Sequence, residues 1–235
     1  ELLLELYSEE IPPNLQLNAK KNLHEKIKGL LNDINLKFES IDPFSSPTRL
    51  VIFIKGLPER IIIPSKEIRG PKVDVIDEIL HKFLKAHQSS QKDLFKRKTE
   101  RGDFYFIKTK TKELLSSETL KEIIVNSIAS IKWKKSMRWA DTDLLWGRPL
   151  RSILAVYNKK VLPFNYGHLK ANEYTFIEKD LDIKSKKVLN FSDYQKLLLN
   201  NNIILDQEKR KKIITNKLEY FCKQKKLKNN YNINL

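Results

Sequence analysis

Residues 131–152 contain the side chains of this sequence that are best suited to chemistry with a nucleic acid. The stretch holds all three tryptophans and the only methionine, and basic residues are interleaved with them. Aromatic rings can stack on unpaired bases while lysine and arginine side chains bind phosphates. Tryptophans more often bury their large surface in a core or an interface, so a structural role is the main alternative for the stretch.

The residues of this stretch differ in what we expect of them. Trp139 is expected in the core. Two arginines flank Pro149 and could bind either a phosphate or a carboxylate inside the fold, because the planar guanidinium pairs with both. The three preceding cations are the better candidates for RNA contact. The candidate RNA-binding residues are therefore Lys134, Lys135, Arg138, Arg148 and Arg151.

Patterns typical of a catalytic or metal site are missing from the sequence. The six glycines form no phosphate-binding loop, and one cysteine with four scattered histidines argues against a zinc site. Asp141 and Asp143 could hold a divalent cation, but aspartates are common in solvated turns. Glu9 and Glu10 could act as paired carboxylates, but they also fit exposed charges ahead of a helix. We therefore assign no catalytic and no metal-binding residue to this chain.

The hydrophobic pattern predicts strands and helices that must position these residues. Short apolar runs predict strands at residues 2–7, 50–54, 61–63, 104–107 and 153–157. Residues 50–54 and 153–157 are apolar enough for the interior of a sheet. Apolar residues at helical spacing predict helices over residues 15–34 and after Asp74, Ser116, Ser192 and Asp206.

Several finer expectations follow from the same pattern. Residues 61–63 should lie beside residues 50–54, and residues 153–157 and 161–166 should form a hairpin. The prolines at 43 and 47 indicate an irregular connection. Residues 209–212 should form the solvated face of the last helix. Because the elements lack a regular βαβ alternation, we predict an α+β fold, with a mixed sheet packed with helices and a helical C-terminal segment.

Composition limits the class of protein. A chain of 235 residues can form one large or two small domains. Its net charge of +16 favours a polyanionic partner, although an abundance of lysine, isoleucine and asparagine also arises from an AT-rich genome. A single cysteine excludes an internal disulfide and favours a cytoplasmic location, and no apolar run is long enough for a membrane span. The start at Glu1 and the Asn/Lys-rich end suggest a piece of a longer protein.

Four collinear motifs give the chain a resemblance to a known family. They are residues 2–12 (LLLELYSEEIP), residues 46–50 (SPTRL), residues 69–71 (RGP), and residues 135–139 (KSMRW) with residues 148–151 (RPLR). The chain resembles, from Leu2 to about Tyr220, the N-terminal part of the β subunit of heterotetrameric bacterial glycyl-tRNA synthetase. One element departs from the family. Residues 174–177 stand where the family usually has a Gly-His-Arg-Phe-like element.

The resemblance implies a division of labour with a partner. In this family the α subunit carries the adenylation site, where ATP with Mg²⁺ is used, and the β subunit contributes tRNA recognition and assembly. No synthetase catalytic motif of either class is visible here, so this chain alone should bind no cofactor and be inactive. The implied partners are the α subunit, in an α2β2 tetramer, and tRNA(Gly).

The resemblance also implies two regions and leaves alternatives open. Residues 1–166 would be the N-terminal α+β domain, and residues 167–235 a basic, largely helical start of the next region, truncated here. A free-standing RNA-binding module, and a scaffold that makes only subunit contacts, remain the alternative functions. Salt-sensitive binding to tRNA would count against the scaffold.

Overall fold

The computed structural model describes residues 1–63, 65–73, 75–87, 89–99, 102–109, 111–138, 144–179 and 182–228. The chain divides into two units. The larger unit joins Glu1–Pro58 to Ser117–Leu235, and the smaller unit is the segment between them, Glu59–Ser116. Both units combine helices with antiparallel strands, so the predicted α+β class is confirmed.

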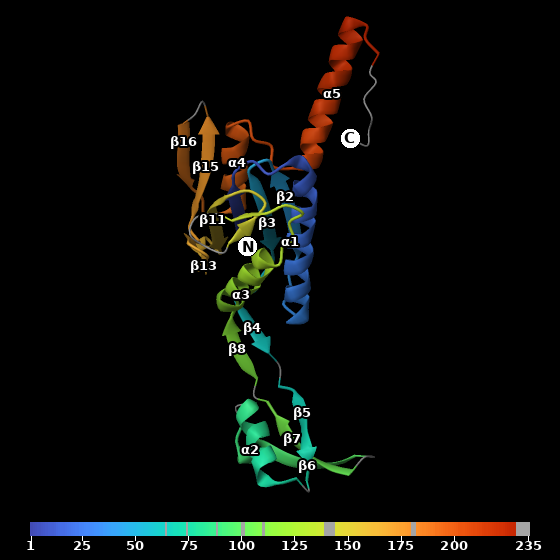
Figure 1. Ribbon diagram of the computed structural model, residues 1–235, viewed down its shortest axis with the longest axis vertical. Helices are drawn as coiled ribbons and strands as arrows, with labels where there is room; N and C mark the ends of the chain where they lie inside the picture. The colour runs from blue at the N-terminus through green and yellow to red at the C-terminus, as the bar shows by residue number, and fades with distance from the viewer. Residues whose placement is uncertain are drawn as a thin grey trace. The chain divides into compact units, whose positions relative to one another are not determined.

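The sheet of the larger unit is built around its first strand. β1 (Leu2–Ser8) lies between β11 (Leu150–Tyr157) and β3 (Arg49–Lys55), and it is antiparallel to both. β2 (Ser40–Ser46) and β12 (Lys160–Val161) complete a five-stranded sheet in the order β12-β11-β1-β3-β2 (Figure 1). The two runs predicted in the sheet interior, residues 50–54 and 153–157, lie in β3 and β11, so that prediction is confirmed.

Both faces of this sheet are covered, which explains why β1 is buried along its whole length. Side chains alternate between the faces of a strand, so Leu2 and Leu4 point one way and Leu3 and Glu5 the other. α1 (Pro13–Asp33) packs against β2 and β3 (Figure 1). It begins at a proline, which suits a first helical position because the missing N–H has no partner there. Its buried apolar residues follow the predicted spacing: Leu15, Ala19, Leu23, Ile27 and Leu31.

The face of Leu3 and Glu5 is covered by elements from the end of the chain. β15 (Tyr174–Lys179) and β16 (Asp182–Lys187) form a ribbon, and α4 (Phe191–Asn200) follows it. Residues after Tyr166 thus share a core with the first strands. The expected division between residues 166 and 167 stays a prediction. The shared core consists of Leu3, Val51, Leu154, Val156, Ile177, Val188, Tyr194, Leu198 and Leu205.

The last helix begins as predicted but is anchored in an unexpected way. α5 (Gln207–Lys225) is capped by Asp206, whose side chain accepts hydrogen bonds from the backbone N–H groups of residues 208 and 209. Arg210 was expected on the solvated face, and that expectation is wrong. Its guanidinium donates to the carbonyl oxygens of Ile204, Leu205 and Ser45 at 2.6, 2.9 and 2.9 Å. The carbonyl of Ser45 lies 165 residues away in the sequence, so no local pattern could reveal this contact.

The smaller unit has its own sheet. β5 (Glu67–Lys72), β7 (Gly102–Lys108) and β6 (Leu94–Thr99) are antiparallel in the order β5-β7-β6, and α2 (Asp77–Ala86) packs against β5. A short 3-10 helix, η1 (Gln91–Asp93), precedes β6. The strand predicted at residues 104–107 is part of β7. Asp74, the expected start of the second helix, lies outside the described residues.

Two finer expectations are corrected by the arrangement of the strands. Residues 61–63 do form a strand, β4 (Arg60–Ile63), but it pairs with β8 (Lys112–Leu115) in the smaller unit rather than with residues 50–54. Pro43 was expected in an irregular connection, but it lies inside β2. β2 is at the edge of the sheet, where a missing N–H is tolerated.

The predicted hairpin at residues 153–166 is much shorter than expected. β12 pairs with β11 for only two residues, and Pro163, which lacks an N–H, follows shortly after it. Residues 165–166 instead form β13 (Asn165–Tyr166), which pairs with β14 (Leu169–Lys170).

α3 (Ser116–Ala129) leads into residues 131–152. It starts at the serine that we expected at the helix start, and its apolar residues Leu120, Ile123, Ile124 and Ile128 are buried as the spacing predicted. Among the helices formed by described residues, none has both the length and the apolar content needed to cross a membrane.

Candidate nucleic-acid interface

Two of the three tryptophans in residues 131–152 pack against each other. The ring centroids of Trp133 and Trp146 lie 5.0 Å apart, and Trp146 is fully buried. Gly147 makes room for the pair, since a Cβ atom there would lie 2.3 Å from Cε3 of Trp133. These two tryptophans therefore have the structural role that was the main alternative. Trp139 lies outside the described residues, so its expected place in the core stays a prediction.

The candidate RNA-binding residues that precede Trp139 in the sequence are exposed. A short hairpin pairs β9 (Met137–Arg138) with β10 (Leu145–Trp146). Lys134, Lys135 and Arg138 are all exposed to solvent. Within the described part of the chain, no carboxylate forms an ion pair with either lysine. Two cations with free ammonium groups beside a rigid aromatic anchor can bind phosphate without first breaking an internal contact.

The two arginines around Pro149 are held differently. Arg151 forms ion pairs with Glu9, at 2.9 Å, and with Glu178, at 3.7 Å. Arg148 is half-buried, and its Nη1 donates to Sδ of Met137 at 3.3 Å. Of the two partners that the sequence left open for Arg151, phosphate or carboxylate, the structure places carboxylates beside it. The five candidate residues therefore include both exposed cations and cations that are held by internal contacts.

Acidic residues near Arg148 and Arg151 show no catalytic arrangement. A surface hollow of about 410 Å³ is lined by Glu9, Glu10, Pro12 and Arg148. Since Glu9 is already paired with Arg151, the two glutamates fit the expected exposed charges ahead of α1 better than a catalytic pair. Asp141 and Asp143 lie outside the described residues. Among the residues that the structure does describe, no cluster of histidine, cysteine and acidic side chains could hold a metal ion.

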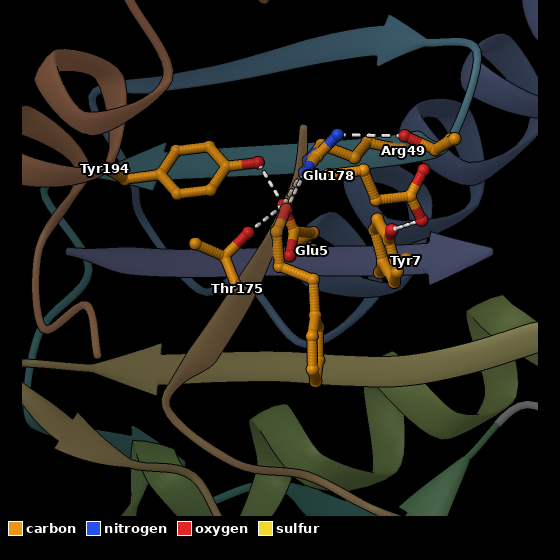
Figure 2. A network of polar contacts seen from close by, with 8 residues as sticks. Glu5, Tyr7, Arg49, Thr175, Glu178 and Tyr194 are labelled. Carbon is orange, nitrogen blue, oxygen red and sulfur yellow. Dashed lines mark hydrogen bonds and ion pairs between the residues drawn. The ribbon is translucent and has the colours of Figure 1, made fainter. Parts of the chain in front are cut away.

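A buried carboxylate in the central strand of the sheet was not identified from the sequence (Figure 2). Glu5 is fully buried in the middle of β1. Its Oε2 accepts hydrogen bonds from Nε of Arg49 at 3.0 Å, from Oγ1 of Thr175 at 2.9 Å, and from the hydroxyl of Tyr194. The one sign in the sequence was an acidic residue inside an otherwise apolar strand, but its partners come from three other elements.

Burial dominates the electrostatics of this network. Removal from water raises the pKa of the Glu5 carboxyl, although the nearby Arg49 charge and the hydrogen bonds oppose that rise. The pKa of Tyr194 is raised as well, first by burial and then by the neighbouring Glu5 charge. The Tyr194 hydroxyl therefore keeps its proton and remains a hydrogen-bond donor to Glu5.

Arg49 extends the network into β15. Its Nη1 donates to Oγ1 of Thr48 at 2.8 Å, and its Nη2 donates to the carbonyl oxygen of Phe176. The guanidinium also lies 4.9 Å from the ring centroid of Tyr7, and the Tyr7 ring stacks on Phe176. In this chain, β15 thus closes the network over the sheet.

The network reaches the surface through a second tyrosine. The hydroxyl of Tyr7 donates to Glu178 (Figure 2). Glu178 in turn pairs with Arg151. Burial raises the pKa of Tyr7, and its bond to Glu178 adds to that rise. Because these polar groups bind one another, the network acts to hold β1, β3, β15 and α4 together and to orient Arg151.

Comparison with known proteins gives this arrangement a family. The family model described as glycyl-tRNA synthetase beta subunit matches residues 2–235. The chain is 37% identical to the glycine–tRNA ligase beta subunit of Rickettsia peacockii over 214 residues, which is 91% of this chain and 32% of that relative. The Rickettsia prowazekii protein of the same name is 36% identical over the same shares. The chain spans about a third of the length of these relatives, and it belongs to the glycyl-tRNA synthetase beta subunit family.

Proposed function

We propose that this chain is the N-terminal part of a β subunit that supports the ATP-dependent attachment of glycine to tRNA(Gly) in the cytoplasm. It would bind tRNA and assemble with an α subunit, as an α2β2 tetramer, and the α subunit would hold ATP, Mg²⁺ and the adenylation site. The family match over residues 2–235 supports this proposal, together with the names of the relatives. No residue of this chain is given a catalytic role.

One observation on the chain itself supports RNA contact at residues 131–138. Lys134 and Lys135 are exposed beside the packed pair of Trp133 and Trp146, so their ammonium groups project from a fixed base. Phosphate contacts supply most of the affinity of such surfaces and make it dependent on salt. Arg138 belongs to the same exposed segment. Arg148 and Arg151 would contribute after giving up internal contacts.

A salt series on tRNA binding tests this interface. The Lys134→Gln/Lys135→Gln variant should bind tRNA(Gly) more weakly. Its salt slope, the slope of log affinity against log salt concentration, should fall in magnitude by roughly one unit for each phosphate that is no longer bound. Lys21→Gln/Lys55→Gln is the matched control, since both lysines are exposed in the larger unit and lie outside residues 131–138. An equal fall in affinity in both variants would mean that only net charge matters, and the assignment to residues 131–138 would be wrong.

Assembly and catalysis need a separate test. The chain should copurify with the α subunit, and glycine-dependent pyrophosphate exchange should require that subunit. Pyrophosphate exchange by this chain in the absence of the α subunit would contradict the proposal that the α subunit carries the adenylation site. Failure to copurify, with tRNA binding intact, would favour a free-standing RNA-binding module.

A further inference from the structure

The sheet of the smaller unit has one face that α2 covers and one that it leaves open. Gly70 of β5 lies against α2, since a Cβ atom there would lie 2.7 Å from Cε1 of Phe83. Because side chains alternate along a strand, the neighbouring Arg69 points to the opposite face. The register places Arg69 beside Phe106 of β7, and Phe106 beside Phe95 of β6. We call this the arginine face; it consists of Arg69, Lys72, Phe95, Arg97, Phe104 and Phe106.

Cationic groups lie over aromatic rings on the arginine face. The guanidinium carbon of Arg69 lies 3.6 Å from the ring centroid of Phe104. That of Arg97 lies 5.2 Å from the centroid of Phe106 and 5.7 Å from that of Phe95. The Phe95 and Phe106 rings are themselves stacked, with centroids 5.9 Å apart. Each arginine is therefore held on a ring, while Arg97 keeps 52% of its side chain exposed.

Charge on this face favours a polyanion. Lys72 adds a third cation near Phe104, with its Nζ 6.0 Å from the ring centroid. The alternation along the described strands places one carboxylate among these cations, that of Glu67, which pairs with Arg97 at 2.9 Å. An exposed ion pair of this kind contributes about 0–1 kcal/mol, so a phosphate can replace the carboxylate readily.

Two properties of an arginine stacked on a phenylalanine favour one class of polyanion, a nucleic acid with unpaired bases. A guanidinium already held on a ring loses little freedom when it forms a bidentate bond to phosphate. Its outer plane is also a surface on which an unpaired base can stack. A duplex would offer phosphates but no free base faces.

We propose that the arginine face binds single-stranded or looped RNA, with phosphates on Arg69, Lys72 and Arg97 and bases stacked on the guanidinium–phenyl pairs. The proposal rests on the proposed function, because it gives the smaller unit its own contact with tRNA. It differs from the interface at residues 131–138 in using stacking as well as charge.

The test uses the full chain and, as its probe, a short unstructured RNA oligonucleotide whose binding is followed by fluorescence anisotropy. The Arg69→Gln/Arg97→Gln variant should bind at least about five-fold more weakly, the change that corresponds to one stacked base. Its salt slope should fall by about 0.7 for each phosphate that the arginines no longer bind. Arg60→Gln/Lys82→Gln is the matched control, since it removes the same charge from exposed ion pairs of the same unit, and it should bind as the unmodified chain does.

A conservative variant separates stacking from charge and guards against misfolding. Arg97→Lys keeps the charge but removes the planar group, so the salt slope should stay while the affinity falls. Ultraviolet crosslinking of the oligonucleotide should map to peptides from β6 and β7.

The outcomes for this proposal and for the proposed function are distinct. Oligonucleotide binding that is unchanged in Arg69→Gln/Arg97→Gln would overturn the arginine face, even if tRNA binding through residues 131–138 persists. Binding of the oligonucleotide that depends on both arginines would support the face, even if the chain fails to bind tRNA(Gly). No oligonucleotide binding by the unmodified chain would also overturn it, and the arginines would then serve only to shield the rings or to contact a protein.

Discussion

Cationic side chains are used in opposite ways around Glu5 and along residues 131–138. Arg49 is 4% exposed, and its guanidinium is bound to a carboxylate, a hydroxyl and a backbone carbonyl. Lys134 and Lys135 are exposed, and the described residues give them no ion-pair partner. The first charge is part of the core of the fold, and the others are available for a ligand.

The difference shows that burial, rather than residue type, decides what a cation does. A charge removed from water must be paired, and removing one partner leaves the other uncompensated. A charge that stays in water contributes little to folding and remains free to attract a polyanion. Arg151 lies between these limits, with 41% of its side chain exposed and two carboxylates beside it.

The largest effect on stability should come from breaking the buried pair. Arg49→Met should lower the free energy of unfolding at neutral pH by about 3–5 kcal/mol, because Glu5 is left buried without its countercharge. Urea denaturation measures this decrease. Adding Glu5→Leu to the variant should restore much of it, since apolar residues often replace a buried pair without penalty. A decrease of similar size in Arg60→Met, where an exposed pair is broken, would contradict the comparison.

The same pair should show a defined pH dependence. Burial raises the pKa of Glu5 above its ordinary value of 4.5, so the folded state binds this proton more tightly than the unfolded state. The stability contributed by Glu5 is therefore full below pH 4.5 and is lost as the pH rises through the raised pKa. Arg49→Met removes the opposing charge and should raise that pKa further. The difference between the variant and the unmodified chain should accordingly be smaller at pH 4 than at pH 7; a difference independent of pH would exclude ionised Glu5 as its cause.

A smaller effect on stability is expected at the packed pair of Trp133 and Trp146, beside the exposed lysines. Gly147→Ala would place a Cβ atom 2.3 Å from the ring of Trp133, so the pair of Trp133 and Trp146 must shift. We expect the free energy of unfolding to fall by about 1–3 kcal/mol, the usual range for overpacking. Tryptophan fluorescence during thermal unfolding measures it. Gly29→Ala is the control, because nothing lies within 4 Å of the added atom in α1.

Arg151 should give a smaller change again. Arg151→Gln breaks two ion pairs at the surface and should lower stability by about 0–1 kcal/mol. A melting curve at low and at high salt checks this, since the difference between variant and unmodified chain should shrink as salt rises. A decrease as large as that of Arg49→Met would place Arg151 with the buried network instead.

The exposed lysines should give the smallest change in stability. Lys134→Gln/Lys135→Gln should leave the melting temperature nearly unchanged, because surface substitutions away from packed features usually stay within about 0.5 kcal/mol. A lowered melting temperature with normal tRNA binding would contradict RNA binding by residues 131–138 and would indicate a role in folding or subunit contact.

The sequence by itself determined the elements whose residues repeat at a clear period. The helix spacing of α1 and α3 and the continuous apolar runs of β3 and β11 could be predicted because one local pattern decides each of them. The family could also be recognised from motifs that lie along the chain in order. The exposed lysines of residues 131–138 were identified by type alone.

Only the tertiary structure decided which strands pair and which charges meet. β4 was visible as a strand, but its partner β8 lies some fifty residues further along the chain, so no short-range pattern could exclude pairing with β3. Glu5 meets Arg49, Thr175 and Tyr194 across as many as 189 residues of sequence. The role of a charge depends on its burial and its partners, which arise only when distant segments pack together. For that reason the sequence left open whether Arg151 binds a phosphate or a carboxylate, and it did not reveal that Arg49 pairs with Glu5.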